Sequence, residues 1–195
     1  MANIAWPDSA IPSDFTLSRY TKVFRGTSLF GKSGQNLDTV NDRWLAKCSI
    51  SIRDRDAAAE LEAFVNKLRG GSAVVLCYHF ARPVISGVLT NPTTIAMAMG
   101  VQNLTLNCAA GDYLKAGDML GIGDQLFQTA FDCAASGTTI TVPLTMRSRK
   151  PIAGSVAVTT VQPTGKFRLV GVGSTTFSPG GITMGTELEL VEVIN

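Results

Sequence analysis

Several kinds of residue on which protein chemistry depends are scarce in this sequence. Histidine occurs once, and none of the 4 cysteines forms a C-x-x-C pair. Because structural zinc sites are built from closely spaced Cys and His ligands, we expect no metal site. No stretch reaches the roughly 18 consecutive apolar residues of a membrane helix, and residues 1–15 lack the basic-then-apolar start of a signal peptide. Without an export signal we expect four reduced, mostly buried thiols: Cys48, Cys77, Cys108 and Cys133.

Charge is also scarce. Charged residues make up 16% of the chain and the formal net charge is +2, so we expect no general attraction to nucleic acid or to anionic membranes. Apolar residues make up 45%, which excludes a disordered chain. With 195 residues, the chain is long enough to bury a core in one large domain or two small ones.

The clearest strand pattern covers residues 43–52. Its even positions are apolar from Trp44 to Ile52, while its odd positions include Lys47, Ser49 and Ser51. This period of two is typical of a half-buried strand. Residues 14–24 alternate more loosely, residues 72–80 are a nearly continuous apolar run, and residues 84–89 are expected to continue the same sheet.

One helix is predicted, over residues 54–69. Its apolar residues are spaced by three and four, Asp54 or Asp56 can cap its first turn, and Gly70-Gly71 can supply a left-handed stop. Burying the apolar face would contribute roughly 1.5–3 kcal/mol per large side chain, so we expect the helix to pack on a sheet.

The middle of the chain changes in composition, toward Gly, Ala and Thr with frequent turns. Short strands are predicted at residues 103–107, 119–122, 126–131, 138–142 and 155–161, a pattern typical of a small barrel or sandwich. The N-terminal sheet lacks a second layer, which the last strands, at 166–172 and 187–194, are expected to supply. The fold class is therefore mainly β: a discontinuous β-sandwich with one helix (residues 1–90 and 162–195) and an inserted second domain of short strands, a small barrel or sandwich (residues 91–161). No internal repeat is evident.

Residues 26–33, GTSLFGKS, match the P-loop pattern G-x-x-x-x-G-K-[ST] letter for letter. In a P-loop the backbone N–H groups at the start of a following helix hold phosphates. The next residues, GQNLD, show no apolar helical spacing, and the sequence has no apolar strand ending in an aspartate that could hold magnesium. We therefore interpret the match as a β-loop and not as a nucleotide site.

The other candidate sites have ordinary structural explanations. Cys77 and His79 should project to one face of a strand, but a nucleophilic pair requires an exposed, activated thiol, so we expect a packed histidine. The basic run at residues 147–150 is expected to be an exposed loop. We predict no catalytic residue, no cofactor and no metal, and hence no enzyme.

Segments along most of the chain form a combination that is frequent in phage tail sequences. They are Trp6-Pro7-Asp8 with Ile11-Pro12 and Phe15, residues 42–46 (DRWLA), a helix ending in residues 64–70 (FVNKLRG), residues 111–120 (GDYLKAGDML), residues 126–128 (LFQ) and residues 167–169 (FRL). In this combination the sequence resembles the distal tail proteins of siphophages.

The resemblance implies a fold, an assembly and partners. In that family a β-sandwich with one helix, built from the two chain ends, makes a hexameric ring. A small β-barrel insertion, often of oligonucleotide/oligosaccharide-binding (OB-like) type, decorates the outside of the ring, which implies an OB-like barrel at residues 91–161. It implies a structural virion protein at the phage tail tip, assembled in the host cytoplasm, that joins the tail tube protein to the tail-tip hub protein. DNA would pass through the lumen without specific binding, no membrane is involved, and there are no catalytic residues to carry over.

A ring requires a heterologous interface, in which one face of each subunit fits a different face of its neighbour. The polar stretch from Arg25 to Asp42 is long enough to reach an adjacent subunit. We expect the subunit interface to include Arg25, Lys32, Asn36, Asp38 and Asp42. Trp44 is expected to anchor the core instead.

Two alternatives remain open from the sequence. One is another tail component, such as a tube or terminator protein, which strand content separates poorly from a distal tail protein. The other is an OB-type module that binds nucleic acid or oligosaccharide. Such a module needs aromatic stacking platforms with interleaved basic residues, and residues 91–161 offer only Tyr113, Phe127 and Phe131 as aromatics.

Overall fold

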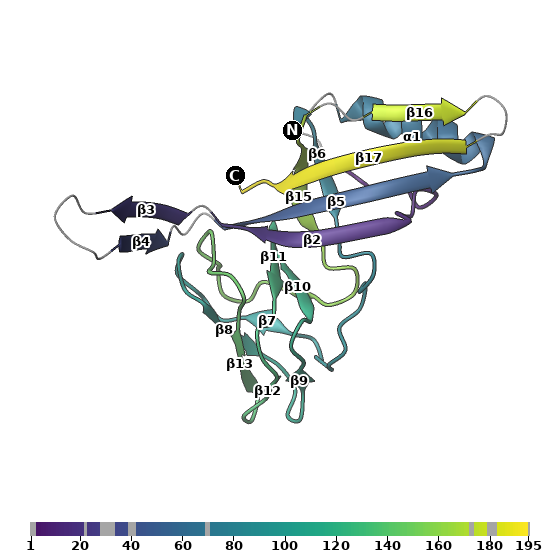
Figure 1. Ribbon diagram of the computed structural model, residues 1–195. Coiled ribbons are helices and arrows are strands. Elements are labelled where there is room, and N and C mark those ends of the chain that lie inside the picture. Colours follow the sequence, from purple (N-terminus) through teal and green to yellow (C-terminus); the bar gives the residue numbers. More distant parts are fainter. Residues whose placement is uncertain are drawn as a thin grey trace.

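The computed structural model describes residues 3–21, 23–27, 34–38, 42–68, 71–171, 174–178 and 183–194, and in these the chain is mainly β with one helix. The mainly-β prediction is confirmed. Figure 1 shows long strands beside the helix, a group of short strands below them, and a hairpin that extends away from both. We call these parts the sheet unit, the central unit (residues 84–161) and the arm (strands β3 and β4).

The sheet unit is built on one mixed sheet of seven strands, in the order β1-β6-β15-β17-β5-β2, with β16 also paired to β17. β15 pairs with the C-terminal part of β17, and β16 with its N-terminal part. The C-terminal strands β15 and β17 therefore lie side by side within one sheet, with N-terminal strands on both sides of them. These strands are β1 (Asn3–Ile4), β2 (Asp14–Tyr20), β5 (Arg43–Ile52), β6 (Val74–Cys77), β15 (Gly165–Leu169), β16 (Ser174–Ser178) and β17 (Thr183–Glu192).

The C-terminal strands do not form the expected second layer. β17 pairs with β5 from Met184↔Ile52 to Val191↔Leu45, and β15 pairs with β6. Buried side chains alternate along both long strands, and the register places them on one face. Pairing side by side thus satisfies the backbone hydrogen bonds and the burial together. The predicted sandwich is instead a single sheet that helix α1 covers on one face.

Helix α1 (Arg55–Lys67) lies within the predicted range of residues 54–69. Asp54 is its N-cap, and the Oδ2 atom of Asp54 accepts a hydrogen bond from the backbone N–H of Ala57 at 2.9 Å. Leu68 is the C-cap, and Gly71 has φ +96°, the left-handed conformation that follows many helices. The cap and the stop therefore have local causes that the sequence reveals.

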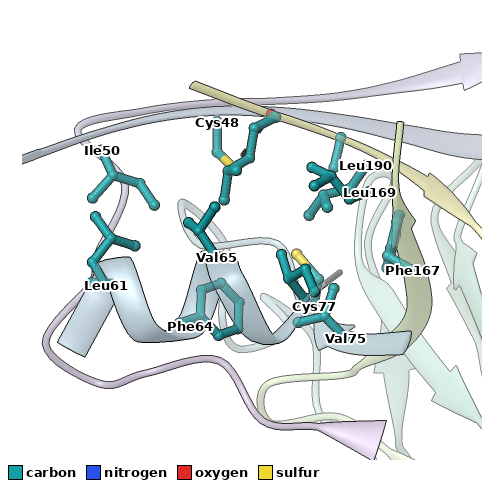
Figure 2. Packing of buried hydrophobic residues seen from close by; sticks show 14 of the residues in the cluster. Cys48, Ile50, Leu61, Phe64, Val65, Val75, Cys77, Phe167, Leu169 and Leu190 are labelled. Carbon is teal, nitrogen blue, oxygen red and sulfur yellow. Dashed lines mark hydrogen bonds between the residues drawn. The ribbon is translucent and has the colours of Figure 1, made fainter. Parts of the chain in front are cut away.

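The first core lies between α1 and the sheet. Figure 2 shows Leu61 and Val65 of the helix facing Ile50 and Cys48 of β5, with Phe64 in the same cluster. β5 has the predicted bounds, and its even positions are buried. Trp44, at the end of this row, is 4% exposed, so the prediction that it anchors the core is confirmed.

All four cysteines are free thiols. Cys48 and Cys77 are buried in the first core, whereas Cys108 and Cys133 are half-buried in the central unit. Burial raises the pKa of the Cys48 thiol to about 12 and raises that of Cys77 as well. These two thiols therefore act as small apolar side chains and not as nucleophiles.

The central unit contains several small sheets around a second core. The sheets have the orders β13-β8-β7, β11-β10-β14 and β12-β9. Buried leucines such as Leu104, Leu106 and Leu120 fill the core with Phe127. Among the described residues these strands do not close into the expected barrel. The strands are β7 (Thr93–Thr94), β8 (Asn103–Asn107), β9 (Tyr113–Leu114), β10 (Met119–Ile122), β11 (Gln125–Gln128), β12 (Cys133–Ala134), β13 (Thr139–Pro143) and β14 (Val158–Thr159).

Residues 84–89 do not continue the main sheet, contrary to the prediction. Val84 forms an isolated bridge with Val161, and Val88 forms one with Tyr113. Ile85 and Leu89 pack against the second core. The chain thus leaves the sheet unit before residue 84, because the hydrogen-bond partners of this segment lie in the central unit.

Candidate assembly surfaces and the joint between the units

The arm is an antiparallel hairpin of β3 (Val23–Thr27) and β4 (Gly34–Asp38), which pair from Val23↔Asp38 to Thr27↔Gly34. Among the described residues these strands pair only with each other. In Figure 1 the arm extends beyond the end of the main sheet, from the point where β2 ends and β5 begins. Because an isolated two-stranded hairpin is marginally stable in water, the arm is a candidate surface for contact with another molecule.

The P-loop match falls on this hairpin. Gly26 and Thr27 end β3, residues 28–33 lie outside the described residues, and Gly34 begins β4. A P-loop requires a helix after the lysine and the hydroxyl residue, and here the chain continues into a strand. The strand that begins at Gly34 stands where a P-loop would have its helix, so the described residues give no support to a nucleotide site.

The structure describes four of the five residues that were predicted for the subunit interface. Arg25 lies on β3, Asn36 and Asp38 lie on β4, and Lys32 falls outside the described residues. Asp42, at the base of the arm, is only 3% exposed and forms an ion pair with Arg19 of β2. Asp42 is therefore engaged within its own chain and does not present its carboxylate at the surface, because the β2–β5 pairing brings Arg19 to it.

The sheet face opposite α1 is uncovered by any described element. Short side chains lie along its middle, including Ser49 and Ser51 of β5 and Gly185 of β17, and they line a depression of about 450 Å³. Lys47 and Glu189 form an exposed cross-strand ion pair at 3.4 Å. This face is thus polar and open to close approach by another surface.

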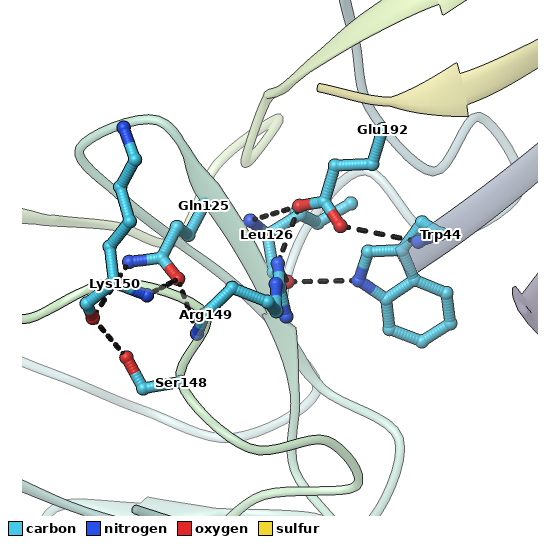
Figure 3. Close-up of polar contacts among 7 residues, drawn as sticks. All are labelled: Trp44, Gln125, Leu126, Ser148, Arg149, Lys150 and Glu192. Atoms are coloured by element: carbon cyan, nitrogen blue, oxygen red, sulfur yellow. Dashed lines mark hydrogen bonds and ion pairs between the residues drawn. The ribbon is translucent and has the colours of Figure 1, made fainter. Parts of the chain in front are cut away.

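A buried joint connects the two units, as Figure 3 shows. Glu192 of β17 forms an ion pair with Arg149 of the central unit, and the two side chains are 0% and 1% exposed. The carboxylate of Glu192 also accepts hydrogen bonds from the backbone N–H groups of Trp44 (3.2 Å) and Leu126 (3.3 Å). The indole Nε1 of Trp44 donates to the carbonyl oxygen of Leu126 at 2.9 Å. The joint therefore ties β5, β11 and β17 together through paired polar groups.

Further contacts hold Arg149 in the joint. The Arg149 guanidinium lies 5.0 Å from the ring centre of Phe127, and its Nη2 donates to the carbonyl oxygen of Leu126. Burial raises the pKa of the Glu192 carboxyl, while Arg149 and the N–H donors oppose that rise. Ser148 and Arg149 are buried, so the basic run at 147–150 is not the exposed loop that the sequence predicts. The pairing with Glu192, 43 residues away, draws the run inward.

Two buried aspartates hold residues 84–90 in place, the segment that includes the wrongly predicted strand at 84–89. Asp118 accepts hydrogen bonds from the backbone N–H groups of Ser86 (2.7 Å) and Gly87 (3.0 Å). Asp112 accepts from the backbone N–H of Thr90 at 2.7 Å and from its hydroxyl at 3.1 Å. Although burial alone would raise the pKa of Asp112, these bonds and one from the Ala109 N–H lower it.

The two aspartates end equivalent turns. The N–H of Asp112 donates to the carbonyl of Ala109, that of Asp118 donates to the carbonyl of Lys115, and each carboxylate accepts the N–H of the same residue in return. The preceding glycine has φ +88° or +92° in the two turns. The sequence carries this signal as G-D-x-L repeated six residues apart in GDYLKAGDML. The expectation that no internal repeat exists is therefore wrong over this short stretch.

His79 is buried but does not form a pair with Cys77. Its Nε2 lies 3.2 Å from Nη2 of Arg82, and its ring packs edge-on against Phe15 at 5.3 Å. The thiol of Cys77 donates to the carbonyl of Tyr78. Burial and the neighbouring Arg82 lower the pKa of His79. This geometry is that of a packed histidine, as predicted.

The described residues hold no cluster of three or more His, Cys, Asp or Glu side chains that could bind a metal ion. No helix within the described ranges is long and apolar enough to cross a bilayer. No protein-family model matches the sequence, and no curated protein matches it either.

Proposed function

We propose that this chain is a structural virion protein that associates into a ring, expected to be a hexamer, at the distal end of a long non-contractile phage tail. The arm carries the proposal: it is a hairpin that pairs with no other described strand and extends beyond the sheet (Figure 1). A hairpin of this kind gains stability when its faces or edges are covered by another molecule. The resemblance to distal tail proteins supplies the class of assembly.

The positions of the arm and the open sheet face support a head-to-tail contact. The arm connects β2 to β5, at one edge of the sheet, whereas the depression around Ser49 and Gly185 lies on the open sheet face. An arm that rests on a neighbour's sheet makes a heterologous contact, and such contacts close into a ring when the rotation per subunit allows it. The short side chains on this face allow another backbone to approach closely.

The proposed partners follow from the proposed role at the distal end of the tail. The two faces of the ring would dock the tail tube protein and the tail-tip hub protein, and DNA would pass through the lumen without specific binding. The role is passive docking of preformed surfaces and not catalysis. The buried joint between Arg149 and Glu192 would keep the central unit at a fixed position on each subunit.

Substitutions on the arm test the proposal. Charge reversal by Arg25→Glu or Asp38→Lys should weaken association by about fivefold or more, since like charges across an interface repel. Lys115→Glu, an exposed change in the central unit, serves as the matched control and should leave association unchanged. Sedimentation measures the oligomer, and negative-stain images show whether it is a ring. If both arm variants assemble as the unmodified chain does, the arm is not the interface.

A further inference from the structure

A groove of about 410 Å³ lies on the sheet unit, and none of its lining residues belongs to the arm. Residues from three separate parts of the sequence line it, among them Trp6, Asp8, Tyr78, Phe80 and Gln162. We call it the aromatic groove. Its volume falls within the range of about 300–1,000 Å³ that is usual for ligand sites.

Three aromatic rings form a continuous wall of this groove. The ring centres of Trp6 and Phe80 are 5.0 Å apart, and those of Tyr78 and Phe80 are 4.4 Å apart. The indole N–H of Trp6 donates to the carbonyl of Ala10 at 2.7 Å, which fixes the orientation of the ring. Trp6, Tyr78 and Phe80 are all half-buried, so part of each ring remains accessible.

The charge at the groove is negative. Asp8 is exposed and is the only charged residue in the described lining. Burial raises the pKa of the Tyr78 hydroxyl, and the nearby Asp8 carboxylate raises it further. Ser9, which follows Asp8 in the chain, donates a hydrogen bond to a second carboxylate, that of Glu60. Lys166, which pairs across the strands with the lining residue Leu76, is engaged with Asp124 at 2.8 Å.

We propose that the aromatic groove binds a lysine or arginine side chain presented by a partner protein. The faces of aromatic rings attract cations through their quadrupoles, and a carboxylate at the rim adds a complementary charge. The aliphatic stem of either side chain would pack against the same rings. A neutral apolar side chain would gain the stem contact alone. This site is separate from the arm, so it does not depend on ring formation.

Titration of the full chain with single amino-acid derivatives tests the proposal. The probes are N-acetyl-lysine amide and N-acetyl-arginine amide, with N-acetyl-norleucine amide as the uncharged equivalent of the lysine stem. The readout is tryptophan fluorescence, since Trp6 lines the groove whereas Trp44, the other tryptophan, is buried in the joint. Trp6→Phe should remove the signal change and thereby assign it to the groove.

We expect the cationic probes to bind with millimolar Kd, about tenfold or more tighter than the norleucine probe. Asp8→Asn should weaken lysine binding about two- to fivefold. Asp14→Asn, an exposed change on β2 that does not line the groove, should leave binding unchanged. Circular dichroism of each variant checks that the fold is intact. Equal binding of norleucine and lysine, or no binding of any probe up to about 100 mM, would overturn the proposal.

Discussion

At the joint, Arg149 and Glu192 neutralise each other in a place that solvent does not reach. A buried ion pair of this kind gives little net stability, because desolvation offsets the attraction, but the loss of one partner leaves an uncompensated charge. We therefore expect Arg149→Met to lower the free energy of unfolding by about 3–5 kcal/mol. The double variant Arg149→Met/Glu192→Leu should lose much less.

Urea unfolding of the two variants beside the unmodified chain measures this difference. If the single variant is no less stable than the double variant, the joint does not depend on charge compensation. In that case Trp44 and the apolar contacts around it would hold the units together on their own.

The carboxylate of Asp112 makes the stability of the protein depend on pH. Because hydrogen bonds from Thr90 and Ala109 lower the folded-state pKa of Asp112, the unfolded chain takes up a proton first. The contribution of Asp112 is therefore complete above the unfolded pKa of about 3.9 and is lost as the pH falls through the lower folded value. Asp112→Asn should lose less stability than the unmodified chain as the pH falls below about 4. Denaturant unfolding at several pH values checks this, and parallel curves for the two proteins would contradict it.

At the scale of elements, the segment at residues 84–90 lies so close to β9 that it leaves no room for a side chain at Gly87. A Cβ atom there would lie 2.3 Å from the carbonyl oxygen of Tyr113 and 2.8 Å from the Cα of Leu114. Gly87→Ala should cost about 1–3 kcal/mol, since the backbone must move to accept the methyl group. Gly154→Ala is the control, because the nearest atom to its added Cβ would be 3.6 Å away. Thermal unfolding measures both, and equal stabilities would show that the segment moves aside at no cost.

Elements that are determined locally could be predicted from the sequence, and those determined by distant partners could not. β5 follows from its own alternation, and α1 follows from its own spacing, its Asp54 cap and Gly71. The place of residues 84–90 depends on carboxylates of Asp112 and Asp118, more than twenty positions later in the chain. No local pattern reveals such a partner.

Among the candidate sites, too, only those with a local signal could be predicted from the sequence. The polar stretch of the arm was evident in the sequence, although its hairpin was not. The joint was missed, because nothing near Arg149 marks Glu192 as its partner. The repeated G-D-x-L signal was present in the sequence but is too short to recognise without the turns that it forms. The aromatic groove collects residues from three stretches, of which only the Trp6 segment stood out as a motif.

At the scale of the whole molecule, the chain combines two joined units with a projecting arm. The joint fixes the central unit to the sheet, while the arm and the open sheet face remain without partners in the described chain. In the ring that we propose, the subunits would dock head to tail, and each arm would reach the next subunit. We therefore expect the protein to form a closed ring.

The most direct test is the solution mass of the purified chain, measured by light scattering over a concentration series. We predict a discrete closed oligomer near six times the subunit mass of 20.6 kDa, with no larger species as the concentration rises. A mass that stays at that of one subunit throughout the series, or that grows without limit, would contradict the proposed closed ring.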